Sequence, residues 1–165
     1  MIESHQLDET IIRFESNPKE IDKLLDHIQS EQSLLIDILI GTHAELLTEE
    51  EMDYLLFLFL GIYGTFDKQQ TISPFSEQEI SKAEEFSWKI INDNNDYNIA
   101  METFFNEIKE TEVMDFIDLS IAPDDENEIQ ISDPGRLIML AVLTALTKLM
   151  EGAASEEGIE TRMEE

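Results

Sequence analysis

TEEEMDYLLFLFLGIY, residues 48–63, is the stretch that decides the fold of this chain. Thr48 and Glu51 have the spacing of a capping box, in which each side chain bonds the backbone N–H of the other residue. The residues from Tyr54 to Tyr63 are almost all apolar, so the predicted helix is apolar on every side. A helix of this kind is normally buried all round. The sequence therefore predicts a central helix enclosed by other elements.

A second apolar stretch, DPGRLIMLAVLTALTKLME, occupies residues 133–151. Asp133 and Pro134 combine a capping residue with a proline at the first helical position, which is a typical helix start. Nearly every residue from Leu137 to Met150 is apolar. We expect this second helix to end at Gly152, because glycine commonly follows the last turn of a helix.

The rest of the chain also has the spacing of amphipathic helices, so the predicted fold is all-α, a single-domain bundle of about seven helices. Asn17 before Pro18, and Ser76 three residues before Glu79, are predicted N-caps. We assign residues 1–151 to the helical domain and 152–165 to an acidic, disordered tail. Besides 48–63 and 134–151, helices are predicted at 6–15, 18–30, 31–47 with a kink at Gly41, 77–92, and 97–118 with a break near 109–111.

Two helices that are apolar all round are more than a small bundle usually needs at its centre. One of them would leave apolar surface facing water, and a second copy of the chain is the commonest cover for such a surface. Ala141, Thr144 and Ala145 are small enough to allow close helix approach, and Leu140 and Leu143 supply contact area. The sequence thus predicts a homodimer through Leu140, Leu143 and their neighbours.

Charge is the most unusual feature of the composition. The chain has 38 acidic and 10 basic residues, for a formal charge of −28. Ten scattered cations cannot form the basic stripe that phosphate backbones require, so direct binding of nucleic acid is excluded. A large negative charge attracts basic surfaces and steers their approach. We therefore predict a protein partner with a basic surface. Simple solvation of the carboxylates and imitation of the phosphate spacing of DNA are the competing interpretations.

Cysteine usage and apolar run length limit the protein class further. The chain has no cysteine, which excludes disulfide frameworks, thiolate zinc sites and cysteine nucleophiles. Its longest apolar runs cover seven residues, far below the ~20 that a membrane-spanning helix needs. The first ten residues carry three acids and no apolar stretch, unlike a secretory leader. These features favour a cytoplasmic location and no membrane partner.

The spacing of the three histidines does not match either of two common metal-binding motifs. His5, His27 and His43 have neither a glutamate three residues before them nor a histidine four residues away. The Glu-x-x-His pattern of di-iron bundles and the His-Glu-x-x-His pattern of zinc hydrolases are thus both absent. We expect no cofactor.

The candidate metal-binding residues are a row of closely spaced carboxylates, Glu107 and Glu110, then Glu112 and Asp115. Carboxylates at three- and four-residue steps on a helix project together and could bind Mg²⁺. The first pair resembles the Glu-x-x-Glu of all-α nucleotide pyrophosphohydrolases, which carry Glu-x-x-Asp on the next helix. The second pair in this chain would be Asp125-x-x-Glu128, within a predicted loop. The resemblance implies a Mg²⁺-dependent nucleotide phosphohydrolase.

A solvated acidic face explains the same row, since nearly one residue in four is acidic. The loop from Asp124 to Glu128 could also attract Ca²⁺, although it lacks the glycine and the final glutamate of an EF-hand. Without a nucleophile motif or a phosphate-binding loop, we favour a non-enzymatic interaction module that binds or inhibits a basic partner. The phosphohydrolase acting through Glu107, Glu110, Glu112 and Asp115 is the alternative.

Overall fold

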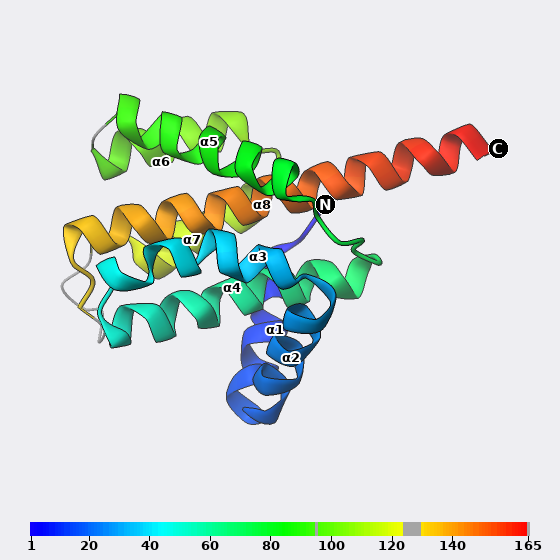
Figure 1. The fold of residues 1–165 in the computed structure, drawn as a ribbon, viewed down its shortest axis with the longest axis horizontal. Helices are drawn as coiled ribbons and strands as arrows, with labels where there is room; N and C mark the ends of the chain where they lie inside the picture. Colours follow the sequence, from blue (N-terminus) through cyan, green and yellow to red (C-terminus); the bar gives the residue numbers. More distant parts are fainter. Residues whose placement is uncertain (95, 124–129, 165) are drawn as a thin grey trace.

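The computed structural model describes residues 1–94, 96–123 and 130–164, and its fold is all-helical, as predicted (Figure 1). Within these residues there are eight α-helices and no strand. The elements are α1 (Ser4–Ser16), α2 (Lys19–Glu31), α3 (Ser33–Leu39), the 3₁₀ helix η1 (Gly41–Leu46), α4 (Glu49–Gln69), α5 (Glu77–Asp93), α6 (Tyr97–Glu107), α7 (Thr111–Ile121) and α8 (Asp133–Glu164).

The eighth helix arises where a single helix over 97–118 was expected to break. Ile108 is extended, with φ −104° and ψ 128°, and its side chain is buried. At this break the side chain of Ile108 enters the core, and α6 is separated from α7. The 31–47 segment also divides, into α3 and η1, at the predicted kink around Gly41.

Helix starts follow the predicted capping signals at two of the four positions. Thr48 and Ser76 both form complete capping boxes, with Glu51 and Glu79. Asn17 gives α2 no side-chain cap, and only its carbonyl accepts a bond, from Glu20 N. At α8 the hydroxyl of Ser132, rather than Asp133, accepts the bond from Gly135 N at 3.1 Å.

Both apolar helices lie inside the bundle. In α4, every residue from Leu58 to Phe66 is buried. α8 lies among α5, α4, α7 and α3, while α1 and α2 pack against α4 (Figure 1). The core is one continuous cluster of apolar side chains that draws on all eight helices. Among the described residues, no helix is both long and apolar enough to cross a membrane.

The predicted dimer contact through α8 is wrong at the residue level. Leu140 and Leu143 are completely buried within a single chain. Thr144, chosen as a small contact residue, is also buried, and its hydroxyl lies 2.8 Å from that of Ser87 on α5. The two apolar helices pack against each other, and different neighbours cover their remaining faces, α1 and α2 on α4 and α3, α5 and α7 on α8. A second copy of the chain would have to use other residues.

α8 also runs further than predicted, because the helix continues through Gly152 to Glu164 and projects beyond the other helices (Figure 1). A single glycine inside a helix costs only about 1 kcal/mol relative to alanine. The segment after it is rich in alanine and glutamate, which favour helix. Gly152 therefore does not end the helix, and the separate tail over 152–165 stays a prediction.

Candidate functional site

The predicted row of carboxylates is divided between two helices and the turn that joins them. Glu107 is the last residue of α6 and is exposed, while Glu110 precedes α7 and is buried. Glu112 and Asp115 are exposed on α7. The break at Ile108 thus separates the members of a row that a continuous helix would have aligned.

Glu110 has a structural role at the beginning of the chain. Its Oε2 accepts a hydrogen bond from the backbone N–H of Ile2 at 2.9 Å. Burial raises the pKa of this carboxyl, although the bond from Ile2 and the nearby N-terminal amine act in the opposite direction. The charge of Glu151 raises this pKa as well. Glu110 therefore ties the first residues of the chain to the start of α7.

Glu151 on α8 was not singled out from the sequence, yet it caps α7. Its Oε2 accepts bonds from the backbone N–H groups of Lys109, at 3.0 Å, and Glu110, at 3.3 Å. These donors lie at a helix start, where N–H groups lack partners within the helix. Lys148 neutralises the same carboxylate at 3.2 Å.

No group of three or more histidine or acidic side chains among the described residues is arranged to hold a metal ion. Asp125 and Glu128, the second pair of the phosphohydrolase pattern, lie outside the described residues, as does the acidic loop from Asp124 to Glu128. The Mg²⁺ interpretation of Glu107, Glu110, Glu112 and Asp115 stays a prediction.

A second group of carboxylates surrounds the end of the bundle where α4 and α8 begin. We define the acidic end as the exposed side chains of Glu45 on η1, Glu49, Glu50 and Asp53 on α4, and Asp133 on α8. Figure 1 shows that both helices start on the same side of the molecule. Acidic side chains at helix starts are stabilised by the positive end of the helix dipole, which explains part of this placement.

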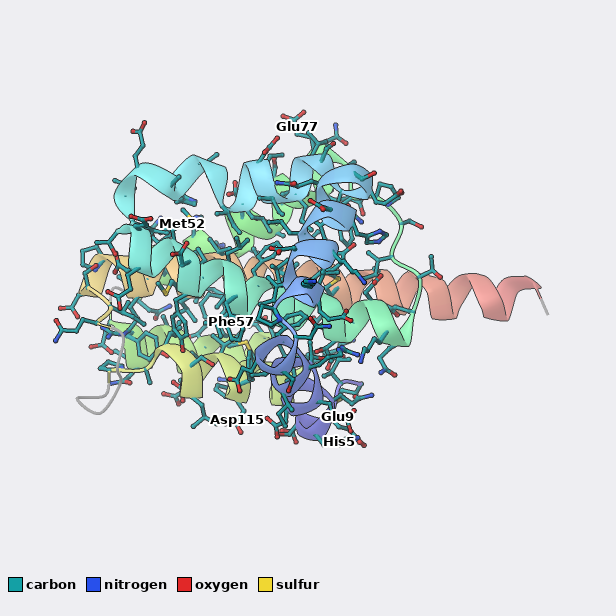
Figure 2. All side chains as sticks on the ribbon, turned by 90° about the horizontal axis from the view of Figure 1, so that it is seen from below. His5, Glu9, Met52, Phe57, Glu77 and Asp115 are labelled. Atoms are coloured by element: carbon teal, nitrogen blue, oxygen red, sulfur yellow. The ribbon has the colours of Figure 1, made fainter. Side chains whose placement is uncertain are left out.

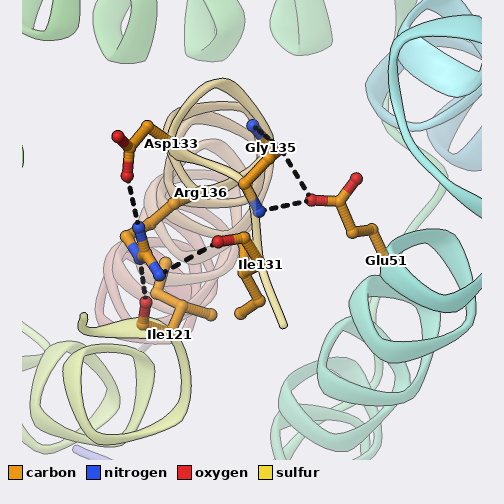
Figure 3. A network of polar contacts seen from close by, with 7 residues as sticks. Glu51, Ile121, Ile131, Asp133, Gly135 and Arg136 are labelled. Carbon is orange, nitrogen blue, oxygen red and sulfur yellow. Dashed lines mark hydrogen bonds and ion pairs between the residues drawn. The ribbon is translucent and has the colours of Figure 1, made fainter. Parts of the chain in front are cut away.

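Beneath these residues, the buried Glu51 joins α4 to the segment before α8 (Figure 3). Its Oε2 accepts bonds from both the backbone N–H and the hydroxyl of Ser132, each at 2.9 Å. Oε1 accepts the Thr48 N–H at 2.9 Å. Burial raises the pKa of Glu51, but the hydrogen bonds from Thr48 and Ser132 outweigh it, and the pKa is lowered overall.

Gly135 allows this close approach of α8 to α4. A Cβ atom at this position would lie 2.8 Å from Cδ of Glu51 and 2.8 Å from the hydroxyl oxygen of Ser132. Any larger residue would therefore displace the Glu51 carboxylate from its donors.

Arg136 fixes the other side of the α8 start. Its Nε donates to the carbonyl of Ile121, the last residue of α7, at 2.6 Å, and Nη2 donates to that of Ile131 at 3.3 Å. Nη1 pairs with Asp133 at 3.1 Å (Figure 3). A cation at the end of α7 also matches the negative end of that helix dipole. The acidic end thus lies beside a network of buried hydrogen bonds that joins the start of α8 to α4 and α7.

One histidine, His43, is half-buried. It lies on η1 with its ring centroid 5.4 Å from that of Trp88, and Nε2 is 3.8 Å from the Glu84 carboxylate. Burial lowers the pKa of His43 and raises that of Glu84. Both shifts favour a neutral side chain, which suits packing between η1 and α5.

Comparison of the chain with protein-family models, curated proteins and solved structures found no match.

The charge balance leads to a prediction about salt. Only four ion pairs occur within the part of the chain that the structure describes, and two of them involve histidine. Most of the carboxylates that the structure describes thus lack a cationic partner and repel one another. Raising salt from about 0.01 M to about 0.15 M shortens the screening length from about 30 Å to about 8 Å. We expect the thermal unfolding midpoint at pH 7 to rise by several degrees, measured by circular dichroism. A flat or falling midpoint would show that favourable charge pairs dominate.

Proposed function

We propose that this protein is a non-enzymatic interaction module that binds a basic protein partner through the acidic end. The observation that carries the proposal is the placement of five exposed carboxylates around the starts of α4 and α8. The segment between Lys23 and Lys68 contains no lysine or arginine, so most of this surface comes from a stretch without cations.

Rigidity supports the same proposal. Glu51 joins the start of α4 to the segment before α8, and Arg136 holds the start of α8 against the end of α7. A partner would therefore meet carboxylates that project from helix starts held in place by buried hydrogen bonds. Preorganised charges bind with a smaller entropic cost than mobile ones. The negative field of the chain would also accelerate the approach of a basic partner at low salt.

The test uses a combined variant, Glu45→Gln, Glu49→Gln, Glu50→Gln and Asp53→Asn, with a fluorescent decalysine peptide as the basic probe. Exposed charge pairs contribute about 0.2–1 kcal/mol each, so losing four should weaken binding by about fourfold to several hundredfold. Fluorescence anisotropy at low salt measures the affinity. Circular dichroism checks that α4 survives the loss of its acidic first turn.

A matched control removes four exposed carboxylates from α1 and α7: Glu9→Gln, Glu15→Gln, Glu112→Gln and Asp115→Asn. Figure 2 places Glu9 and Asp115 on one side of the molecule. Both variants lose the same net charge, so the control should retain most of the affinity if the acidic end is the binding surface. Equal weakening in the two variants would contradict the proposal, since binding would then follow net charge alone.

A further inference from the structure

A hollow of about 300 Å³ lies between α1, α2 and α4, away from the acidic end. Its volume corresponds to roughly ten water molecules and to the lower limit for small-molecule sites. Three of its lining residues are uncharged, Phe14, Leu24 and Gly64. The charged and titratable lining residues are Arg13, Glu20, Lys23, His27, Asp67 and Lys68.

Cations are concentrated here in a chain that has few. Arg13, Lys23 and Lys68 are three of only ten lysines and arginines in the whole sequence. None of the three belongs to an ion pair among the described residues. These three cations line one hollow without an ion-pair partner among the described residues, so their charges are free to bind an anion there.

Arg13 supplies a second, independent observation. Its Nε is buried and has no hydrogen-bond partner among the residues that the structure describes. A buried N–H group without an acceptor is costly, so such groups normally find a partner. Nε is closed to solvent, so an anion in the hollow would provide one only after the Arg13 side chain turns toward it. The guanidinium group then binds phosphate or carboxylate oxygens with paired hydrogen bonds.

Gly64 allows the apolar floor of the hollow to pack closely against α4. A Cβ atom there would lie 3.0 Å from Leu24 Cδ2 and 3.7 Å from Phe14 Cζ. A glycine inside a helix lowers helix stability, and here it permits the close approach of the two N-terminal helices.

We propose that this hollow binds a small organic phosphate. The phosphate contacts Arg13, Lys23 and Lys68, and hydroxyl groups of the organic part donate hydrogen bonds to Glu20 and Asp67. Three cations match a doubly charged phosphate better than a single carboxylate. The volume of the hollow and the net charge of −28 oppose long polyanions such as nucleic acid.

The first experiment titrates the protein with ribose 5-phosphate, with ribose, and with inorganic phosphate. Two-dimensional NMR follows the backbone amides, and the Gly64 signal serves as the local reporter. We expect saturable shifts at Gly64 with ribose 5-phosphate, weaker binding of inorganic phosphate, and no binding of ribose. Equal binding of ribose, or no response to any of the three probes, would overturn the proposal.

Variants then test the assigned cations. Arg13→Gln should weaken ribose 5-phosphate binding at least about tenfold, the usual effect of losing a charge-assisted contact. Lys23 lies on the exposed rim of the hollow, so Lys23→Gln should weaken binding without disturbing the fold. Lys89→Gln removes the same charge from the exposed face of α5 and should leave the affinity unchanged. Equal effects of all three substitutions would refute the site, because they would report net charge only.

Discussion

Replacing Leu140 by aspartate is expected to unfold the protein. Leu140 is completely buried on α8, in the middle of the core cluster. Removing a buried leucine side chain costs about 2–5 kcal/mol, and burying an unpaired carboxylate adds several kcal/mol more. The sum is comparable to the whole stability of a typical domain, about 5–15 kcal/mol. Circular dichroism should therefore show loss of helix at 25 °C.

The control places the same charge on the surface. Leu119 on α7 is 78% exposed, so Leu119→Asp should change the free energy of unfolding by less than about 0.5 kcal/mol. A folded, soluble Leu140→Asp protein with an unchanged unfolding midpoint would place Leu140 outside the core. That outcome would support the contact between two copies of the chain that the sequence pattern predicted at Leu140.

The error about Leu140 has a physical cause. Hydrophobic periodicity reports that a helix is buried on all sides, but it does not say whether the cover comes from the same chain. In this fold α8 lies among α3, α4, α5 and α7, which cover it within one chain. That arrangement depends on contacts between distant segments, such as the Ser87–Thr144 pair, which no local pattern reveals.

Local signals predicted the helices well because they depend on neighbouring residues. The capping boxes at Thr48 and Ser76 form as their spacing indicates. The division of α6 from α7 was expected near residues 109–111 and is explained only by tertiary contacts. Glu151, more than 40 residues further along the chain, supplies the acceptor for the N–H groups of Lys109 and Glu110.

The candidate sites were harder to predict, because both combine distant residues. Arg13, Lys23 and Lys68 are separated by up to 55 positions, and each alone is an ordinary surface cation. Only the packing of α1 and α2 against α4 brings them to one hollow. Glu51 was recognised as a capping residue, but its bonds to Ser132 require α8 to start beside α4.

Glu51→Gln is expected to be the most destabilising substitution of an acidic residue at the α4 start. The carboxylate accepts bonds from Thr48 N–H and from two donors of Ser132. A glutamine amide would turn its NH₂ group toward at least one of these donors. Hydrogen bonds to charged groups contribute about 1.5–3 kcal/mol, so we expect a loss of about 2–4 kcal/mol at pH 7. The neighbouring Glu50→Gln, on an exposed side chain, should have little effect.

The effect of Glu51→Gln should also depend on pH, with a sign fixed by the pKa of Glu51. The folded-state pKa lies below the reference value of 4.5, so the folded chain favours the ionised carboxylate. The stability that Glu51 contributes is then fully present above pH 4.5 and is lost as the pH falls through the folded pKa. Urea unfolding of both proteins at pH 7 and near pH 3 measures this change. The difference between parent and variant should shrink in acid, because below pH 4.5 the unfolded carboxyl is protonated and folding must release that proton. A difference that stays constant would mean that Glu51 acts through packing rather than through its charge.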